Sequence, residues 1–476
     1  MQKERHLFDE FFRPAPPQVD VEGIQRAWLA LKPPFRVDER TLPLPVWARR
    51  GYTETGPEAW QTLRRDVGHI QVDKPLCIYV HIPFCDSKCG FCDSYSFRLT
   101  PKHRTAQVDR YVTMLQQEIH LWSEQGFLDR RPVTTVHFGG GTPSFLGEAA
   151  FKRLVESCAA CFNTSPQTEW ALESTVAHLP PAMLSLLNRL GFTRLHIGVQ
   201  SLEDPVRRSI GRRQPAAKVL EKIAETISLD WIVTVDLICG LPGQTLPGFI
   251  AGIEALLDLG VPGFSLYELL VYPQNRKWAE RHGLVGRGHL TNYFLFQAGA
   301  GLLDSAGFKK NLFNHFANEQ DKNLYFTFPE RGEDLLALGT IADGVFGDYH
   351  YRHPIYKHYC RQIGHAFPAL DGGLRRNEFE NYLQPITTAL LSGRIPAALR
   401  PYLEVTPPGS GQPLLQQWFD SALLMDNPDE GYLDLTANGA WFAGNMISHL
   451  ATATHAALQS HLFIPTGTGR MAAYSP

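Results

Sequence analysis

The chain has 476 residues, 44% of them hydrophobic, which is long enough for two or three domains with a sizeable buried core. Its 45 basic and 48 acidic side chains nearly cancel, so the charge gives no indication of a nucleic-acid partner or an anionic membrane. No apolar run approaches the roughly 20 residues that span a bilayer, and the first residues lack a secretory pattern. Eight cysteines are too few for a disulfide framework. We therefore expect a soluble protein of the reducing cytoplasm.

The first 75 residues differ in composition from the rest of the chain. Proline-punctuated, irregular stretches at 12–17 and 32–36 flank a short amphipathic helix predicted over 21–31. Trp28, Trp47 and Trp60 favour burial over disorder. The pattern predicts an N-terminal extension, residues 1–75, that packs over the main domain.

From residue 76 onward, strand-like and helix-like segments alternate. Helical spacing is clear over 108–121, where Tyr111, Leu115 and Ile119 share one face. Short β-type runs are predicted at 77–82, 133–138, 169–172, 194–199, 232–238 and 263–267. Strands that alternate with helices predict an α/β fold with a parallel sheet and right-handed crossovers.

Three closely spaced cysteines follow the first of these strands. Cys85, Cys89 and Cys92 have the spacing Cys-x3-Cys-x2-Cys. Cysteine thiolates hold iron–sulfur clusters, and three of them would leave one iron of a [4Fe–4S] cubane open to a small molecule. A structural zinc site needs a fourth ligand, and nearby Cys77 lies in an apolar run that is typical of a buried strand. The spacing therefore indicates a cluster that performs chemistry at iron.

A glycine-rich string, His137 to Ser144, follows the second strand. Consecutive glycines allow the backbone to approach a ligand closely and to point its N–H groups inward. Taken alone, such a string is also typical of an ordinary turn.

These motifs, with Tyr79 and His81 before the first cysteine and Gly240-Leu-Pro-Gly-Gln-Thr245 further on, resemble the radical S-adenosylmethionine (SAM) superfamily. The resemblance is to the branch related to oxygen-independent coproporphyrinogen III dehydrogenase, from about residue 76 to 342 and weakly to the C-terminus. It implies a partial (β/α)6 barrel with its chemistry at the C-terminal ends of the strands. It also implies a [4Fe–4S] cluster on Cys85, Cys89 and Cys92, and an electron donor such as flavodoxin or ferredoxin.

The chemistry that the resemblance implies begins at the open iron, where SAM binds through its amine and carboxylate. The reduced cluster cleaves a carbon–sulfur bond, which yields methionine and a 5′-deoxyadenosyl radical that abstracts hydrogen from the substrate.

The resemblance assigns SAM contacts to residues at strand ends. A carboxylate at Glu173 suits the SAM ammonium group, although a strand-end salt bridge is the alternative. Asp236 lies in a hydrophobic run, needs partners there, and is near the ribose hydroxyls in relatives. The implied positions are Tyr79, Gly140, Gly141, Thr142, Glu173, Gln200, Arg212 and Asp236. Arg212 matches the partner of the SAM carboxylate, a role that Arg213 could share or take.

Relatives in this branch can bind a second SAM beside the first. The positions that match this second site are Phe91, Gly140, Asp236, Tyr325, and Leu269 and Leu270 through their backbone. Asp343 falls where relatives carry an apolar residue, which predicts an altered substrate pocket.

Several activities of the branch compete. Coproporphyrinogen dehydrogenases carry a fourth cysteine just after the triplet, where this chain has Asp93-Ser94. Haem chaperone relatives share the aspartate but carry a His-Asn haem-binding string that we do not find here. Haem-opening relatives carry an N-terminal extension like this one.

The interpretation that we favour at this point is a class C radical SAM methyltransferase, including cyclopropane-forming members of natural-product pathways. A second SAM would donate a methylene carbon to an sp2 carbon of a small-molecule substrate, and a partner enzyme could act on the product. The proton that then leaves or arrives would pass through Tyr267, Glu268, His315 or Asp343, each of which has a structural alternative.

The predicted organisation has four parts. Residues 1–75 form the extension, 76–310 the barrel, 311–400 a connecting region for substrate and second SAM, and 401–476 a small winged-helix-like domain. The last lacks a basic helix, so we expect it to act as a lid or substrate contact and not to bind DNA.

Overall fold

The structure, a computed structural model, describes residues 2–36, 40–67, 73–125, 128–362, 367–427 and 430–462. Within these residues, 13 strands form one mixed sheet in the order β1-β15-β14-β13-β12-β2-β5-β6-β7-β8-β9-β11-β10. Six of its strands run parallel in chain order: β2 (Leu76–Ile82), β5 (Val133–Gly140), β6 (Glu169–Ser174), β7 (Arg194–Gln200), β8 (Ile232–Cys239) and β9 (Gly263–Glu268). The predicted α/β fold with its six-stranded barrel is confirmed.

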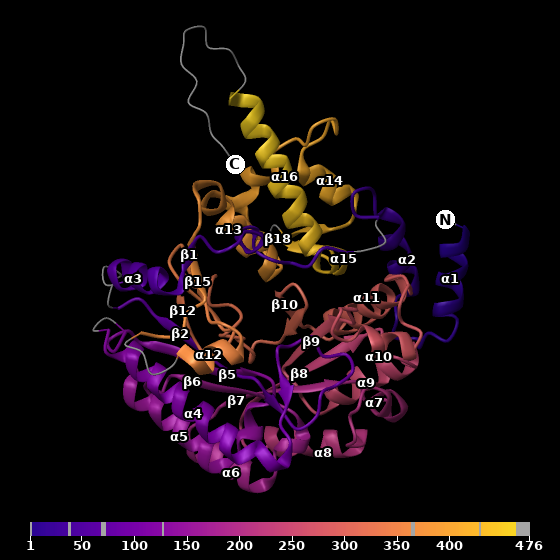
Figure 1. The fold of residues 1–476 in the computed structure, drawn as a ribbon. Coiled ribbons are helices and arrows are strands. Elements are labelled where there is room, and N and C mark those ends of the chain that lie inside the picture. Colours follow the sequence, from indigo (N-terminus) through magenta and orange to yellow (C-terminus); the bar gives the residue numbers. More distant parts are fainter. Residues whose placement is uncertain are drawn as a thin grey trace, which may run out of the picture.

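Helices between these strands cover the outer face of the sheet (Figure 1). The predicted helix over 108–121 lies inside a longer one, with Tyr111, Leu115 and Ile119 all fully buried. The strands themselves are almost entirely buried, which explains why they read as continuous apolar runs. The covering helices are α4 (Pro101–Ser123), α5 (Glu148–Cys161), α6 (Pro181–Arg189), α7 (Asp204–Ser209), α8 (Ala216–Ile227) and α9 (Leu246–Asp258).

The region after the barrel extends both edges of the same sheet. On one edge β12 (Asp334–Leu338) pairs parallel with β2, and β13 (Asp343–Phe346), β14 (Tyr349–Arg352), β15 (Gly372–Arg375) and β1 (Glu54–Thr55) follow antiparallel. On the other edge β11 (His315–Ala317) pairs with β9, and β10 (Lys309–Leu312) pairs with β11. These strands are short, and the alternation of apolar residues did not predict them.

A buried carboxylate ties helix α4 to the segment after β12. Glu118 accepts hydrogen bonds from the Gly339 backbone N–H at 3.0 Å, from His353 at 2.5 Å and from the Tyr359 hydroxyl at 2.5 Å. Because Glu118 is only 1% exposed, losing any of these partners would leave a buried charge poorly satisfied. The arrangement fixes the turn at 339–343, which leads to Asp343.

The N-terminal extension packs against the rest of the molecule, as predicted. Helix α2 (Val21–Ala30) begins at the predicted residue, where the Asp20 side chain caps the Gly23 N–H. Trp28 is buried between Phe8 and Phe294, the latter on α11 (Leu290–Ser305). The other helices here are α1 (Gln2–Phe12), η1 (Val46–Arg49) and α3 (Gly56–Val67).

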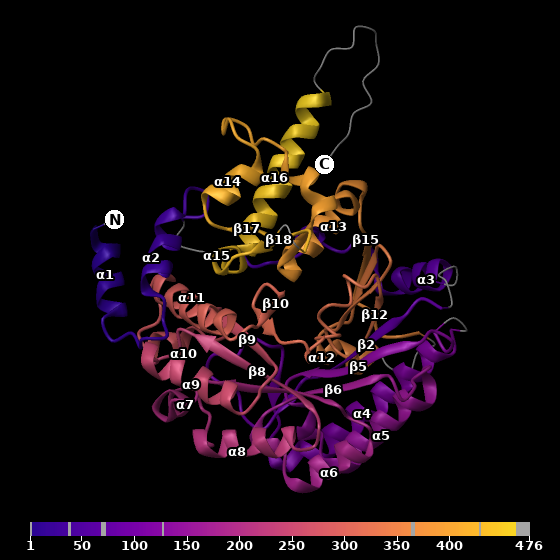
Figure 2. The same ribbon diagram turned by 180° about the vertical axis from the view of Figure 1, so that it is seen from behind.

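The C-terminal part lies over the open side of the barrel, seen from two opposite sides in Figures 1 and 2. A three-stranded sheet of β16 (Arg394–Pro396), β18 (Tyr432–Leu435) and β17 (Leu424–Asn427) packs there with the long helix α16 (Ala443–Leu462). Its other helices are α13 (Glu378–Ser392), η4 (Ala397–Leu403), α14 (Leu414–Asp420) and α15 (Ala437–Trp441). None of the helices in the described ranges has the length and apolar character needed to cross a membrane.

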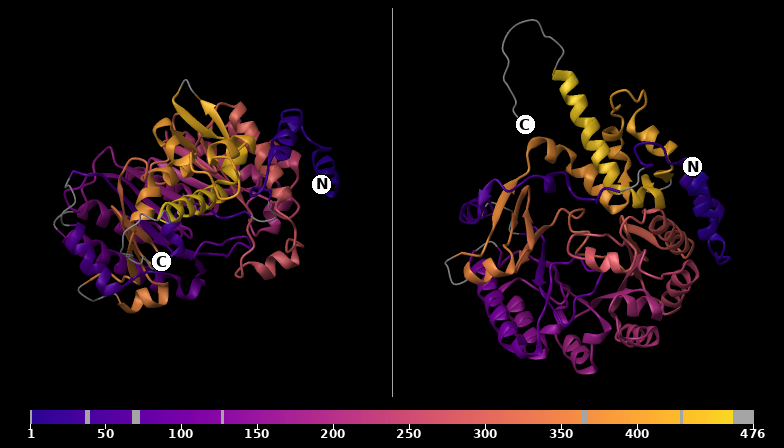
Figure 3. Two further views of the ribbon diagram at one scale, coloured as in Figure 1. Left: turned by 90° about the horizontal axis from the view of Figure 1, so that it is seen from above. Right: turned by 45° about the vertical axis from the view of Figure 1, so that its right-hand side comes forward.

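The segment that follows residue 40 runs between the barrel and the C-terminal part, as Figure 3 also shows. The Thr41 N–H donates to the Asn445 side chain at 3.0 Å, and Arg50 pairs with Glu380 at 2.6 Å. The segment then enters the sheet as β1 beside β15. The N-terminal segment therefore bridges the two larger parts.

Candidate active site

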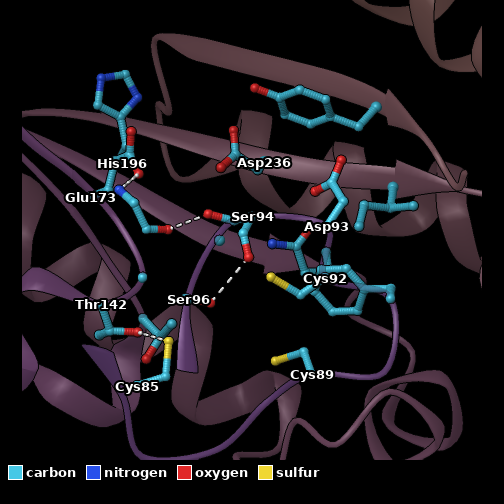
Figure 4. A pocket seen from close by; sticks show the side chains of 18 of the residues that line it. Cys85, Cys89, Cys92, Asp93, Ser94, Ser96, Thr142, Glu173, His196 and Asp236 are labelled. Carbon is cyan, nitrogen blue, oxygen red and sulfur yellow. Dashed lines mark hydrogen bonds between the residues drawn. The ribbon is translucent and has the colours of Figure 1, made fainter. Parts of the chain in front are cut away.

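A cavity of about 1320 Å³ lies at the carboxyl ends of the parallel strands (Figure 4). Its walls also include residues 40 and 42–44 of the N-terminal segment, and residues 313, 314, 325, 326 and 341–343 of the region after the barrel. Of the residues that we expected at the site, all line this cavity except His315: Tyr79, Cys85, Cys89, Phe91, Cys92, Gly140, Gly141, Thr142, Glu173, Gln200, Arg212, Asp236, Tyr267, Glu268, Leu269, Leu270, Tyr325 and Asp343.

The cysteine loop leaves β2 and returns through a short pairing of β3 (Phe84–Cys85) with β4 (Phe97–Arg98). All three cysteines are free thiols and partly exposed, and Figure 4 shows their sulfur atoms turned toward a common space. Burial raises the pKa of the Cys85 and Cys89 thiols, and each must lose its proton to act as an iron ligand. As thiolates, the three would hold three irons of a [4Fe–4S] cluster and leave the fourth iron open.

Lys88 forms hydrogen bonds with several other residues of the cysteine loop. Its ammonium group donates to the Ser94 carbonyl at 2.7 Å and to the Ser96 hydroxyl at 2.9 Å, and lies 3.6 Å from the Cys92 sulfur. The Ser94 hydroxyl in turn donates to the Gly140 carbonyl at 2.8 Å. Lys88 and Ser94 therefore join the cysteine loop to the glycine string.

The glycine string does not present its N–H groups to the cavity, so that expectation is wrong. The Gly140 N–H donates to Glu173 at 3.1 Å, the Gly141 N–H to the Ile82 carbonyl at 2.7 Å, and the Thr142 N–H to the Phe84 carbonyl at 2.9 Å. Gly140 has φ +105°, and a Cβ there would come within 2.5 Å of the His81 ring. Glycine is required because the end of β2 approaches so closely.

Glu173 at the end of β6 is a charged acceptor that faces the cavity. Its Oε1 lies 2.9 Å from His137 Nε2, and because a carboxylate only accepts, the histidine donates. Burial opposes ionisation, but the hydrogen bonds from His137 and the Gly140 N–H outweigh it and lower the pKa of Glu173. With its side chain 33% exposed, Glu173 keeps accessible surface for a cationic group such as the SAM ammonium.

Gln200 and Arg212 converge over Gly198. A Cβ at Gly198 would lie 2.7 Å from Gln200 Nε2 and 3.3 Å from Arg212 Nη2. Arg212 Nε is buried without a hydrogen-bond partner, and among the described residues no carboxylate lies within ion-pair distance of this guanidinium. Two converging donors, one of them an unpaired cation, fit an incoming carboxylate, which the resemblance assigns to SAM.

Asp236 on β8 reaches the same cavity from the neighbouring strand. Burial, with a smaller contribution from the Glu173 charge, raises the pKa of Asp236 to about 7. Near neutral pH this carboxyl group can therefore either donate or accept a hydrogen bond, which suits contacts with hydroxyl groups.

The four proton-transfer candidates differ in whether another side chain already pairs with their acidic or basic group. Glu268 is ion-paired with Arg40 at 2.5 Å, and Asp343 with Arg352 at 2.5 Å. Tyr267 exposes 39% of its surface and lines the cavity, and among the described residues it has no ion-pair partner.

His315 is buried and does not line the cavity. One ring nitrogen contacts the Ser265 hydroxyl at 2.8 Å and the other the Asp321 carboxylate at 2.7 Å, so both are engaged within the protein. Its side chain is 3% exposed.

The second-SAM positions also converge here, with part of their backbone already engaged. The Leu269 N–H donates to the Cys239 carbonyl at 2.9 Å, while the Leu270 and Phe91 carbonyls accept from the Asn275 side chain. The Tyr325 ring stacks on His137 with centroids 4.2 Å apart.

Other lining residues were not predicted from the sequence. Lys88 lies inside the cysteine motif, so its position was the available signal. His196 and Arg207 carry no local pattern, because their place in the cavity depends on contacts that only the folded chain brings together.

Comparison with known proteins places these motifs in a family. Residues 79–256 match the model of the radical SAM superfamily. The chain is 25% identical over 403 residues to the anaerobilin synthase of Escherichia coli O157:H7. The matched residues cover 82% of this chain and 87% of that protein. It is 27% identical to the oxygen-independent coproporphyrinogen III oxidase of Salmonella typhimurium, over 67% of this chain and 72% of that protein. The haem chaperone HemW of Bacillus subtilis is 32% identical over 41% of this chain and 51% of its own length.

A solved structure supports the fold over most of the chain. The coproporphyrinogen III oxidase HemN from Escherichia coli superposes with a TM-score of 0.71 and 22% identity, over 84% of this chain and 95% of that one. Residues 79–256 of the chain therefore match a radical SAM domain, and the cofactors of that superfamily are a [4Fe–4S] cluster and SAM.

Proposed function

We propose that this protein is a radical SAM enzyme that acts on a tetrapyrrole, with a haem-opening reaction of the anaerobilin synthase kind as the leading candidate. The observation that carries the proposal is the cavity, whose volume of about 1320 Å³ exceeds the ~300–1,000 Å³ typical of small-molecule sites. We propose that the space beyond the cluster and SAM takes a substrate the size of a macrocycle. Residues 40 and 42–44, which belong to the N-terminal extension, form part of its wall.

The relatives support the same choice. Anaerobilin synthase, coproporphyrinogen oxidase and the haem chaperone are all similar to this chain, and the first matches it well beyond the radical SAM domain. None of these is a class C methyltransferase, so the tetrapyrrole alternative replaces methyl transfer as our leading interpretation. Coproporphyrinogen oxidation is less favoured, because Ser94 stands close after Cys92 where that group carries a fourth cysteine.

In this proposal the residues divide by role. Cys85, Cys89 and Cys92 hold the cluster, which with SAM supplies a 5′-deoxyadenosyl radical for hydrogen abstraction. Glu173 holds the ammonium group of SAM, and Gln200 with Arg212 holds its carboxylate.

The remaining roles concern the substrate and protein partners. Tyr267, which lines the cavity and has no ion-pair partner among the described residues, is placed to exchange a proton with the substrate. The reductant is proposed to be a flavodoxin or a ferredoxin.

The test is anaerobic turnover with defined substrates. Reconstituted protein is incubated with SAM, a reductant and either haem or coproporphyrinogen III, and the products are identified by mass spectrometry. We expect 5′-deoxyadenosine and an opened tetrapyrrole with haem, and neither product with a Cys89→Ala variant. Unchanged haem and unchanged coproporphyrinogen in protein that cleaves SAM would contradict the proposal.

A second candidate is methylene transfer from a second SAM. It is favoured by the convergence of Phe91, Leu269, Leu270, Tyr325 and Asp343 on the same large cavity. With methyl-deuterated SAM, this reaction places deuterium in 5′-deoxyadenosine. Unlabelled 5′-deoxyadenosine formed during productive turnover would exclude it.

A further inference from the structure

The loop after β7 holds Gln200 in a conformation that its residue type does not favour. Gln200 has φ +69°, in the left-handed region where residues other than glycine are uncommon. The residue is only 7% exposed, and its amide reaches the Gly198 subsite. Such a conformation persists only where surrounding contacts hold it in place.

Arg207 supplies those contacts from helix α7. One nitrogen of its guanidinium group, Nη1, donates both to the Val199 carbonyl at 2.9 Å and to the Ser201 carbonyl at 2.8 Å. These carbonyls flank Gln200 on either side. The Arg207 Nε donates to the Gln214 carbonyl at 2.8 Å, and the Arg207 carbonyl accepts the Arg212 N–H at 2.8 Å. Arg207 thus contacts the backbone around both donors of the subsite.

Arg207 is also a buried cation without an anion beside it. It is 3% exposed, and no carboxylate among the described residues lies within ion-pair distance. Burial, and less strongly the neighbouring Arg212 charge, lowers the pKa of Arg207 to about 10, which leaves it charged at neutral pH. The Asp204 charge offsets part of this effect, but no carboxylate among the described residues pairs with Arg207, so the buried positive charge attracts an anion to its surroundings.

We propose that Arg207 is a positioning residue for the SAM carboxylate: it fixes the Gln200 backbone and adds a second positive charge behind Arg212. Fixing the backbone requires an arginine, because a lysine cannot reach the three carbonyls with a planar fork, whereas a lysine would keep the positive charge. The inference rests on the placement of the SAM carboxylate at Gln200 and Arg212, and does not depend on the identity of the substrate.

The test compares two ligands that differ in the amino-acid part. S-adenosylhomocysteine carries the carboxylate, whereas 5′-methylthioadenosine keeps the nucleoside and the sulfur but lacks the amino-acid group. Their dissociation constants are measured by equilibrium dialysis on anaerobic, cluster-reconstituted protein without substrate. The variants are Arg207→Met, Arg207→Lys, Arg212→Met as the positive control, and Arg208→Met as the matched control, since Arg208 is the exposed neighbour of Arg207 on the same helix.

We expect Arg207→Met and Arg212→Met to weaken S-adenosylhomocysteine binding by about tenfold or more, a loss typical of one charge-assisted contact. The dissociation constant of 5′-methylthioadenosine should change by less than about twofold in these variants. Arg208→Met should leave the dissociation constants of both ligands unchanged. Arg207→Lys should fall between Arg207→Met and the native protein.

Three outcomes would overturn the inference. An Arg207→Met variant that binds S-adenosylhomocysteine normally, while Arg212→Met does not, would show that Arg207 has no such role. Equal losses for both ligands would show that Arg207 only maintains the fold. Normal binding of S-adenosylhomocysteine by Arg212→Met would show that the SAM carboxylate does not lie at Gln200 and Arg212. None of these results bears on the tetrapyrrole assignment.

Discussion

At the scale of single residues, the charges around the cavity are unevenly satisfied. Glu268 and Asp343 each pair with an arginine, whereas Arg212 has no acidic partner among the described residues. Hydrogen bonds from His137 and the Gly140 N–H lower the pKa of Glu173, and its side chain remains 33% exposed. The groups that remain free are those that SAM, with an ammonium and a carboxylate, would complement.

Replacing Glu173 should therefore weaken SAM binding. In Glu173→Gln the amide cannot carry the charge that holds an ammonium group, so we expect about a tenfold loss of affinity, or roughly 1.4 kcal/mol. Equilibrium dialysis with SAM on cluster-loaded protein measures it, and Glu148→Gln, an exposed position on α5, is the control. Unchanged affinity in Glu173→Gln would refute the ammonium assignment.

Lys88 should raise the reduction potential of the cluster. A positive charge 3.6 Å from the Cys92 sulfur favours the reduced, more negative state, so Lys88→Met should lower the reduction potential of the cluster. Potentiometric titration followed by electron paramagnetic resonance measures the shift, and Lys88→Arg should retain most of the native value. Lys102→Met, an exposed position at the start of α4, serves as the control. A potential that is the same in Lys88→Met and native protein would contradict this role.

Asp236 predicts how stability changes with pH. The pKa of Asp236 is about 7 in the folded protein and 3.8 for an ordinary aspartate, so the folded state retains a proton that the unfolded state has lost. Its contribution to the free energy of unfolding therefore declines as pH rises from about 4 to about 7. Asp236→Asn lacks this loss, so its stability relative to the native protein should increase over that window.

Denaturant unfolding of the protein without cofactors, measured at several pH values, tests this expectation. Asp258→Asn, at the exposed end of α9, is the control. A constant difference between Asp236→Asn and native protein across the range would show that Asp236 titrates normally.

At the scale of elements, the site depends on how closely the end of β2, where the cysteine loop begins, lies against the end of β5. Gly140→Ala must accommodate both φ +105° and a Cβ 2.5 Å from the His81 ring. Gly191→Ala is a matched control, because Gly191 has φ +83° and a Cβ there would meet nothing within 4 Å. We expect Gly191→Ala to cost about 1–2 kcal/mol from the backbone alone, and Gly140→Ala at least about 1 kcal/mol more.

Denaturant unfolding and iron content measure the two glycine variants. Equal losses of stability in both would mean that the His81 ring can move away from β5 without cost. In that case the close contact between the end of β2 and the glycine string does not hold the site together.

Prediction from the sequence succeeded best where elements are long and buried. The six parallel strands are continuous apolar runs, so the sequence predicted where they lie. The cysteine loop and the glycine string could be recognised from the spacing of their cysteines and glycines. The orientation of the glycine N–H groups was not predictable, because it depends on the carbonyls of Ile82 and Phe84 in a different segment. The same holds for the pairing of His137 with Glu173, and of Arg40 with Glu268, since each joins residues far apart in the chain.

At the scale of the whole molecule, one cavity collects contributions from three regions. The barrel supplies the cysteine loop and the SAM contacts, the N-terminal segment supplies residues 40 and 42–44, and the strands after the barrel bring Asp343 to the rim. Arg40 joins two of these regions to the C-terminal part, because it contacts both Glu268 and the Trp441 carbonyl. The substrate site is therefore a property of the assembled chain and not of the radical SAM domain alone.

The most direct test of the proposed function is whether SAM cleavage depends on a tetrapyrrole. The rate of 5′-deoxyadenosine formation is measured anaerobically with SAM and reductant, with and without haem, in parallel with haem consumption. We predict a rate that rises with haem and a fixed ratio of 5′-deoxyadenosine to haem consumed. A rate that is the same with and without haem, and with coproporphyrinogen III in its place, would contradict the tetrapyrrole assignment.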